Sequence, residues 1–376
     1  MADLNWKTGF EIELLAPPGK SRFDLATAIA ESHGGTVRRC FYPQSEPSLV
    51  PGTKVFENLT LGFDCRDGLG NPVAKCVDDL TIRANLDRNS APVPGWYRIV
   101  SDDVRLLRLI MAQCDAGADA GDVLRPVARL FKTELIHEKD GIVRLVDDMR
   151  APVALLSGLP GERHRPCELI TPPLETGHLA YLEGVLAIAR DLGFTLPLEA
   201  ATHVHFDATR LRSASVFATL VRIVSGFGAQ LRSLMAANRN CTRLGPVPQE
   251  LVNLVGEPGF VNSSWEKALG RLRAIELSKY CDFNFLNIVH DTPGKSTFEV
   301  RILPGMMQAR EIVECAAFFE AVLNWCVERQ PAQPLPGDLP GLIGKLSMDE
   351  DLRARLLRRA QAPAPARSLL RRALRI

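Results

Sequence analysis

The sequence predicts an α+β fold in which helices flank a mainly antiparallel sheet. Short segments with the alternation of strands, such as residues 9–15 and 297–303, are intermixed with segments of helical spacing, such as residues 308–329. The strands and helices do not follow the regular βαβ spacing of a doubly wound fold, and no glycine-rich turn joins a strand to a helix. These observations favour an antiparallel sheet over a parallel one.

The N-terminal part contains a strand, a helix and a long region of sheet. Residues 9–15 alternate as a strand, which ends at Pro17-Pro18-Gly19. Residues 23–33 have helical spacing and end at Gly34-Gly35, which is typical of a C-cap. Residues 36–100 contain short β-type runs between prolines and glycines, so we expect sheet and loops there.

The rest of the chain continues to mix helices with strands. Ser101-Asp102-Asp103 is expected to cap a helix that extends to about Cys114. Residues 115–150 have little periodicity and are expected to be a surface excursion. The remaining elements are expected as strands at 167–170, 202–207, 283–289 and 297–303, and as helices at 176–193, 213–238, 263–277 and 308–329.

The C-terminal end differs in composition from the rest of the chain. Residues 330–340 are rich in proline and are expected to be a linker. Residues 351–376 contain eight arginines and no lysine among spaced leucines, which predicts two short amphipathic helices separated by Pro363 and Pro365. Two interpretations fit this tail: a solvated end, or a segment that binds an acidic protein partner or another copy of the chain.

The composition is that of an ordinary globular protein. Lys and Arg (45) nearly equal Asp and Glu (44), so we do not expect a nucleic-acid partner. The nine cysteines are scattered singly without a CxxC pair, which favours reduced thiols over a zinc knuckle or a disulfide framework. No apolar run approaches the length of a membrane span, and no apolar signal region begins the sequence. We therefore expect a cytoplasmic protein without a membrane partner.

Four of the predicted strands carry ionisable side chains on one face. Residues i and i+2 of a strand project to the same side, so Glu11 and Glu13 lie opposite the apolar residues that alternate with them. The same alternation places further polar residues together, namely His203, His205 and Asp207 in the strand 202–207, Glu299 and Arg301 in the strand 297–303, and Glu168 in the strand 167–170.

Each of these polar faces has two interpretations. An antiparallel strand often has one face in water, and this explanation is sufficient for any one strand. If the four strands belong to one sheet, however, the face gathers four glutamates beside two histidines, which is tolerable around metal ions or a polycationic ligand. Oxygen ligands favour Mg²⁺ or Mn²⁺, although the His-x-His pair taken alone would also suit zinc. His33, His137 and His164 lack such a context and are expected at the surface.

Five short motifs resemble the amidoligase family in their order along residues 9 to about 326. They are a G-x-E-x-E strand (Gly9, Glu11, Glu13), the segment Glu168 to Pro173, the H-x-H-x-D segment (His203, His205, Asp207), an aromatic strand from Tyr280 to Asn287, and a closing E-x-R (Glu299, Arg301). The resemblance implies a catalytic domain similar to those of glutamine synthetase and glutamate–cysteine ligase. It also implies three segments: an amidoligase-like catalytic domain (1–329), a proline-rich linker and short connection (330–350), and the arginine-rich tail (351–376).

The resemblance also implies a role for each motif residue. Divalent ions, Mg²⁺ or Mn²⁺, that clamp the phosphates of ATP would be held by Glu11, Glu13, Glu168, His203 and Glu299. His205 would lie near the phosphates, and Arg301 would stabilise the transferred phosphoryl group or the substrate carboxylate. Asp207 and Asn287 would contact substrate or nucleotide. Two departures from glutamine synthetase are visible: only Glu162 or Glu175 stands near Glu168 as a second metal glutamate, and Ala200-Ala201-Thr202 replaces its glycine-rich segment.

The implied activity is an ATP-dependent ligase that joins a carboxylate to an amine through an acyl phosphate, giving an amide or isopeptide bond. The substrates would be small-molecule or peptide carboxylates and amines, including amino acids or a polyamine. Such chemistry depends on charge neutralisation and positioning and needs no Ser or Cys nucleophile, and no G-x-S-x-G motif is present. Three alternatives remain at this point: a phosphotransferase on the same fold, a metal-dependent hydrolase that uses the His-x-His pair, and a non-catalytic protein that binds through its tail.

Overall fold

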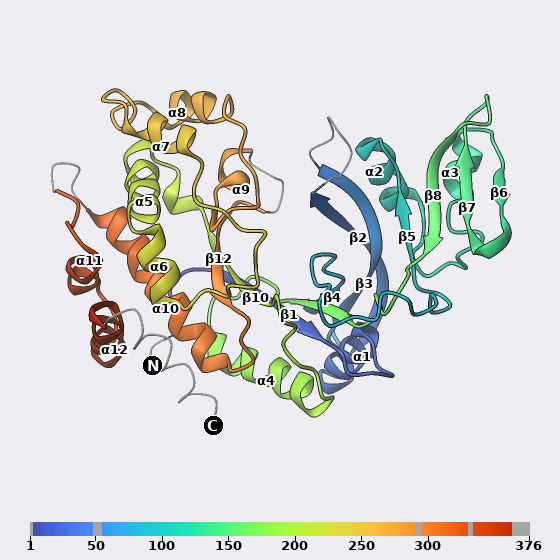
Figure 1. The fold of residues 1–376 in the computed structure, drawn as a ribbon, viewed down its shortest axis with the longest axis horizontal. Coiled ribbons are helices and arrows are strands. Elements are labelled where there is room, and N and C mark those ends of the chain that lie inside the picture. Colours follow the sequence, from blue (N-terminus) through green and yellow to red (C-terminus); the bar gives the residue numbers. More distant parts are fainter. Residues whose placement is uncertain (1–2, 48–54, 291–294, 330–333, 363–376) are drawn as a thin grey trace. The chain divides into compact units, whose positions relative to one another are not determined.

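A computed structural model describes residues 3–47, 55–290, 295–329 and 334–362 (Figure 1). Over these residues it has α+β architecture, with twelve α-helices and a large sheet in which antiparallel strand pairs run from β2 and β3 to β10 and β12. The predicted α+β class with an antiparallel sheet is therefore confirmed, and the similarity to the catalytic domain of glutamine synthetase remains a prediction.

The chain divides into two compact units. Unit 1 comprises residues 1–11, 173–186 and 199–376, and unit 2 comprises residues 12–172 and 187–198. The boundary falls within β1 (Thr8–Leu15) and again within α4 (His178–Asp191), so each unit contains part of both elements.

Unit 1 combines four strands with most of the helices. Its strand order is β11 (Phe283–Asn284), β12 (Thr297–Pro304), β10 (Ala201–Asp207) and the first half of β1. The 3-10 turn η2 (Thr209–Leu211) follows β10. The helices are α5 (Ala214–Gly226), α6 (Gly228–Leu234), α7 (Gln249–Gly256), α8 (Trp265–Leu272), α9 (Leu286–Val289), α10 (Ala309–Glu328), α11 (Leu339–Lys345) and α12 (Glu350–Gln361).

An aromatic core lies on the apolar face of β12. The ring of Phe298 is stacked parallel to that of Phe283 at 6.2 Å and contacts Phe285 at 5.2 Å. Phe319 of α10 packs edge-on against Phe283 at 5.9 Å. These rings are fully or almost fully buried, so aromatic contacts attach α10 and the short β11 to the sheet.

The helical region predicted at 213–238 is two helices with a bend of 68° between α5 and α6. The break falls at Phe227, between Gly226 and Gly228. Among the described residues, no single helix is long and apolar enough to cross a membrane, and the bent pair meets that test only jointly. Its apolar side chains, such as Phe217 and Leu220, are completely buried, as expected for a core helix.

Unit 2 is dominated by antiparallel strands. They follow the second half of β1 in the order β9 (Pro166–Ile170), β4 (Pro72–Val77), β3 (Val55–Arg66), β5 (Tyr97–Val100), β8 (Pro152–Gly158), β7 (Val143–Val146) and β6 (Leu135–His137), with β2 (Thr36–Pro47) paired to β3. The helices α1 (Arg22–Ser32), α2 (Val104–Gln113) and α3 (Arg125–Leu130), and the 3-10 turn η1 (Lys139–Gly141), complete the unit. Figure 1 shows β2 and β3 curving together along their length.

The segment 115–150 was expected at the surface, and this expectation is wrong. Leu124 and Val127 are fully buried in the hydrophobic core of unit 2, together with Leu145 from β7. They pack with Leu59 and Ile99 of the neighbouring strands. The sequence does not predict these elements, because the strands are only three or four residues long and do not show a clear hydrophobic period.

A buried arginine joins α1 to the sheet of unit 2. Arg22 follows the capping box formed by Ser21 and donates hydrogen bonds to the carbonyl oxygens of Leu61, Arg163 and Pro166. Its guanidinium also lies 4.5 Å from the centre of the Trp96 ring. These contacts satisfy a cation that would otherwise be costly to bury.

Two further elements differ from their predictions. The strand expected at 283–289 is the two-residue β11 followed by α9, because the Asn284 side chain accepts a hydrogen bond from the Leu286 backbone N–H and turns the chain into a helix. The helix expected at 263–277 is the shorter α8, which begins after the N-cap Ser264.

The C-terminal segment is packed onto unit 1 as far as it is described. Residues 339–345, at the end of the expected linker, form α11, and Leu342 is completely buried. The amphipathic helix expected after residue 351 is α12, which buries Leu352 and Leu356 and pairs Arg355 with Glu314 at 2.8 Å. The second expected helix lies outside the described residues, and a protein partner for the tail remains a prediction.

The role of the segment 115–150 can be tested by a pair of substitutions. Leu145→Ala leaves a cavity in the core of unit 2 and should cost about 2–5 kcal/mol of unfolding free energy. Met149 lies four residues away and is 84% exposed, so Met149→Ala should change the unfolding free energy by less than about 0.5 kcal/mol. Urea unfolding followed by circular dichroism measures both, and equal small effects would contradict this core assignment.

Candidate active site

The candidate site occupies one face of the unit 1 strands. β1 contributes Glu11, β10 contributes His203 and His205, and β12 contributes Glu299 and Arg301. His205 lies directly opposite Glu299 in the antiparallel register, so their side chains share a face. The register shifts between Thr202 and Val204, which gives β12 one extra residue beside His203. This bulge bends the strand next to the cluster.

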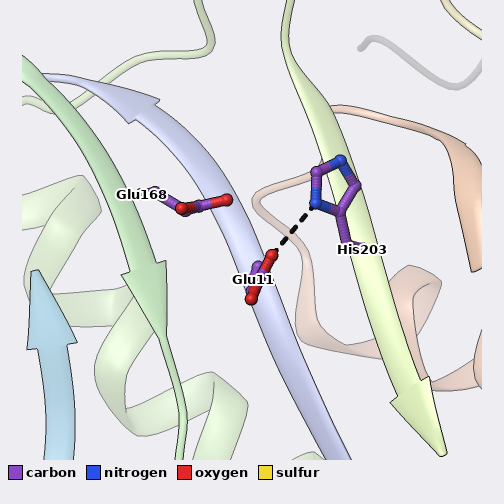
Figure 2. A group of neighbouring side chains, drawn as sticks. All are labelled: Glu11, Glu168 and His203. Atoms are coloured by element: carbon purple, nitrogen blue, oxygen red, sulfur yellow. Dashed lines mark hydrogen bonds and ion pairs between the residues drawn. The ribbon is translucent and has the colours of Figure 1, made fainter. Parts of the chain in front are cut away.

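The Glu11 carboxylate lies between the two histidines. His203 Nδ1 is 3.2 Å from Glu11 Oε2, the contact drawn in Figure 2, and His205 Nε2 is 3.2 Å from Glu11 Oε1. The same two imidazole nitrogens lie 3.6 Å and 3.7 Å from Glu299 Oε1. Each histidine therefore faces two carboxylates.

The second carboxylate is held by two further side chains. Arg301 forms an ion pair with Glu299 Oε1, on the same face of β12. Asn284 of β11 donates a 2.7 Å hydrogen bond to Glu299 Oε2. Glu299 and Asn284 are almost completely buried. Since both oxygens of Glu299 have partners, the carboxylate is fixed in one orientation.

Positive neighbours keep both carboxyl groups ionised. Burial alone would raise the pKa of Glu11, but the charge of His205 and hydrogen bonds with both imidazoles hold that pKa well below its ordinary value. Burial likewise opposes ionisation of Glu299, and the charge of Arg301, followed by that of His205, lowers the Glu299 pKa to about 2. Both side chains are therefore anions at neutral pH.

The two histidines differ in protonation. Burial, together with the charge of Arg301, lowers the pKa of His203 to about 4. Burial also disfavours the charged form of His205, but Glu11 and Glu299 outweigh it and raise the His205 pKa above its ordinary value. The site therefore pairs a neutral imidazole with a readily protonated one.

Comparison with known proteins identifies the family. A family model described as "putative amidoligase enzyme" matches residues 4–323. The chain belongs to the amidoligase family. A search of the curated proteins finds no match. Family membership indicates that this amidoligase is an enzyme of the ligase class that forms amide bonds, and the predicted family is confirmed.

The donor set of the amidoligase fits a divalent cation. Ligand atoms of Glu11, His205 and Glu299 all lie within 4.8 Å of one another, a spacing that one ion can bridge. Two carboxylates and an imidazole are ligands that Mg²⁺ or Mn²⁺ accepts. A cation bound there would replace the proton of His205 as the compensating charge, so binding should release that proton.

Of the other predicted metal ligands, His203 belongs to unit 1, and Glu13 and Glu168 belong to unit 2. Glu13 follows Glu11 by two residues on β1 and is completely buried, and Glu168 is carried by β9 and is also labelled in Figure 2. Their role as metal ligands remains a prediction. Glu162 and Glu175, considered as a further metal glutamate, form ion pairs with Arg165 and Lys7.

The two residues predicted to contact substrate lie at the edge of the cluster. Asp207 ends β10, and its carboxylate accepts a hydrogen bond from the Thr209 backbone N–H at 2.8 Å, so it initiates the turn η2. Asn287 lies in α9 and donates to Thr297 Oγ1 at 3.3 Å. Neither contact tests the predicted role, which remains a prediction.

Sequence reasoning missed two residues that orient the cluster. Thr297 Oγ1 lies 3.4 Å from His205 Nδ1, and Asn284 binds Glu299 as described above. Thr297 could have been found because it precedes Glu299 by two residues on the same strand face. Asn284 could not, because its role depends on the pairing of β11 with β12. Of the histidines expected at the surface, His33 and His137 are exposed, whereas His164 is half-buried beside Trp96.

The difference between the histidines gives a direct measurement. In metal-free protein, the His203 ring should take up a proton only near pH 4. The His205 ring should lose its proton at a pH above the ordinary histidine pKa of about 6.5. NMR titration of the imidazole resonances, assigned with the His203→Gln and His205→Gln variants, measures both. Two histidines that titrate together near pH 6.5 would show that the charges of Glu11 and Arg301 do not act on them.

Proposed function

We propose that this amidoligase is an ATP- and Mg²⁺-dependent carboxylate–amine ligase with a glutamine-synthetase-like catalytic domain. The observation that carries the proposal is the buried cluster of Glu11, His203, His205, Glu299 and Arg301, within the region that matches the family. Carboxylates and cations that are held in fixed positions suit a reaction in which a negatively charged phosphoryl group is transferred. The products would be an amide or isopeptide, ADP and phosphate.

The reaction has two steps in this proposal. A carboxylate oxygen of the substrate attacks the γ-phosphorus of ATP, forming an acyl phosphate while the bond to the ADP oxygen breaks. The amine then attacks the acyl carbon, the bond from carbon to the phosphate oxygen breaks, and the amine loses a proton. The second step succeeds because phosphate is a much better leaving group than the oxide of a free carboxylate.

The residues of the cluster divide this work. A divalent ion held by Glu11, His205 and Glu299, with His203 beside them, would neutralise phosphate charge. Glu13 and Glu168 of unit 2 remain ligands that only the family resemblance predicts. Arg301 presents a planar guanidinium that the Glu299 carboxylate orients, which suits bidentate contact with a phosphoryl group or a carboxylate. Asn284 keeps Glu299 in place while Arg301 engages the substrate.

The products of nucleotide turnover test the mechanism. With Mg²⁺, a carboxylate and an amine, the protein should release ADP and phosphate in step with amide formation. A panel of carboxylate and amine pairs, scored by ADP release and by mass spectrometry of products, measures this. Release of AMP and pyrophosphate would contradict an acyl phosphate, a phosphorylated product without amide would indicate a phosphotransferase, and turnover without nucleotide would indicate a hydrolase.

Two substitutions on β12 separate metal binding from group transfer. Glu299→Gln removes a ligand charge and should weaken both Mg²⁺ binding and turnover, whereas Arg301→Lys keeps the charge, loses the planar fork and should slow turnover by on the order of a hundredfold with normal Mg²⁺ binding. Titration of Mg²⁺ against activity, with Mn²⁺ binding followed by electron paramagnetic resonance, distinguishes the two effects.

Matched controls exist on α10. Glu311 and Arg310 are exposed there, so Glu311→Gln and Arg310→Lys should leave both Mg²⁺ binding and turnover unchanged. Near-normal activity of Glu299→Gln at low Mg²⁺ would reject the metal assignment.

A further inference from the structure

One face of the unit 2 sheet carries a group of polar side chains that the proposed mechanism does not use. Residues opposite each other in antiparallel strands share a face. One row crosses four strands with Tyr42, Thr60, Arg98 and Ser157, and the adjacent row places Gln44 opposite Asn58. The residues between these rows, such as Leu59, belong to the hydrophobic core on the opposite face. The polar residues are therefore gathered on one side of the sheet.

Two side chains in these rows are almost completely buried. Asn58 is 0% exposed and Thr60 is 1% exposed. Within the described part of the chain, neither polar atom of the Asn58 amide nor Oγ1 of Thr60 has a hydrogen-bond partner, and the same holds for Nε of Arg98. An unsatisfied buried polar group destabilises the folded state, so two adjacent residues with such groups are unfavourable for the stability of the fold. Such groups point to a ligand that pairs with them.

Other side chains of the same row are more accessible. Tyr42, Arg98 and Ser157 are only partly buried, and Thr60 lies between Tyr42 and Arg98 in this row. A ligand that binds the partly exposed Arg98 would therefore lie next to Thr60 and Asn58, and contact with their buried atoms would require the neighbouring side chains to move.

This polar face is also the face of the predicted ligand Glu168. A Cβ added to Gly62 of β3 would lie 3.0 Å from Val77 Cγ1 of β4, so Val77 projects to the same side as Thr60, two residues before Gly62. Val77 in turn lies opposite Glu168 of β9. From the strand spacing and rise per residue, Thr60 is roughly 12 Å from Glu168 along the sheet. A small substrate can span that distance.

We propose that Asn58, Thr60 and Arg98 form a subsite for one substrate of the ligase, an amino acid or peptide that presents a carboxylate. The guanidinium of Arg98 suits the carboxylate. The Asn58 amide offers both a donor and an acceptor, and the Thr60 hydroxyl offers either, which matches an amino or amide group next to that carboxylate. This inference rests on the proposed ligase function for its meaning, although binding at the subsite requires neither ATP nor metal.

Substitutions with similar shape separate a binding role from a structural one. Thr60→Val and Asn58→Leu remove unsatisfied polar atoms, so the unfolding midpoint of each variant should equal or exceed that of the unmodified protein. Their affinity for the substrate should nevertheless fall on the order of tenfold, since the hydrogen bonds to it are lost. Arg98→Met should weaken binding of the carboxylate in the same way. A purely structural role predicts no such loss.

The binding experiment uses the full chain without nucleotide. A panel of free amino acids and dipeptides, including L-glutamate and glycylglycine, is screened by NMR saturation transfer, and hits are titrated by calorimetry against the three variants. Thr36→Val and Arg38→Met are matched controls, because both residues are exposed on β2 of the same unit and should leave binding unchanged.

The outcomes separate this subsite from the ligase proposal. Panel binding that the three variants weaken and the controls do not would support the subsite even if no amide were formed. Amide formation with unchanged substrate affinity in the three variants would overturn the subsite and leave the ligase proposal intact. The subsite would also be overturned if no member of the panel bound. A crystal structure in which an ordered water binds Asn58 and Thr60 both with and without substrate would overturn it as well.

Discussion

The candidate site depends on the neutralisation of two buried carboxylates. Glu11 and Glu299 lose most of their contact with water, and an uncompensated charge in that position would cost several kcal/mol. The compensating groups come from different strands: β10 supplies the imidazoles, and β12 supplies Arg301. β1 brings a negative charge to this face, and β10 brings the imidazoles. The pairing of these strands is therefore needed to neutralise the buried charge of the site. A divalent ion would also neutralise the two carboxylates, with a larger positive charge.

In both units, polar side chains gather on one face of the sheet and the hydrophobic core packs against the other. In unit 1 the rings of Phe283, Phe298 and Phe319 form an apolar core on the face opposite Glu299. In unit 2 the core around Leu59 lies opposite the row that contains Asn58 and Thr60. The apolar face offsets the free-energy cost of the polar one, since burial of large side chains stabilises the sheet that carries the charges. An antiparallel sheet permits this division because its side chains alternate.

Much of the fold near the site was predictable because its strands are long and regular. The segments 9–15, 202–207 and 297–303 alternate cleanly and are strands β1, β10 and β12, and helix α10 was predicted at 308–329. The prediction failed at 283–289, where the Asn284 side chain ends the strand and begins a helix. It also failed at 115–150, where core residues such as Leu124 lie in short elements without a clear hydrophobic period. In both places tertiary pairing and packing outweigh the weak local pattern.

The sequence by itself determined which side chains share a face within each strand. The period of two residues follows from backbone geometry, so Glu299 with Arg301 and His203 with His205 could be grouped without coordinates. Only the tertiary structure decided which strands lie side by side and in which register, and therefore that His205 faces Glu299. It also decided the protonation of the two histidines, because burial and distance to the neighbouring charges set their pKa values. Those quantities depend on contacts between residues far apart in sequence, which no local pattern encodes.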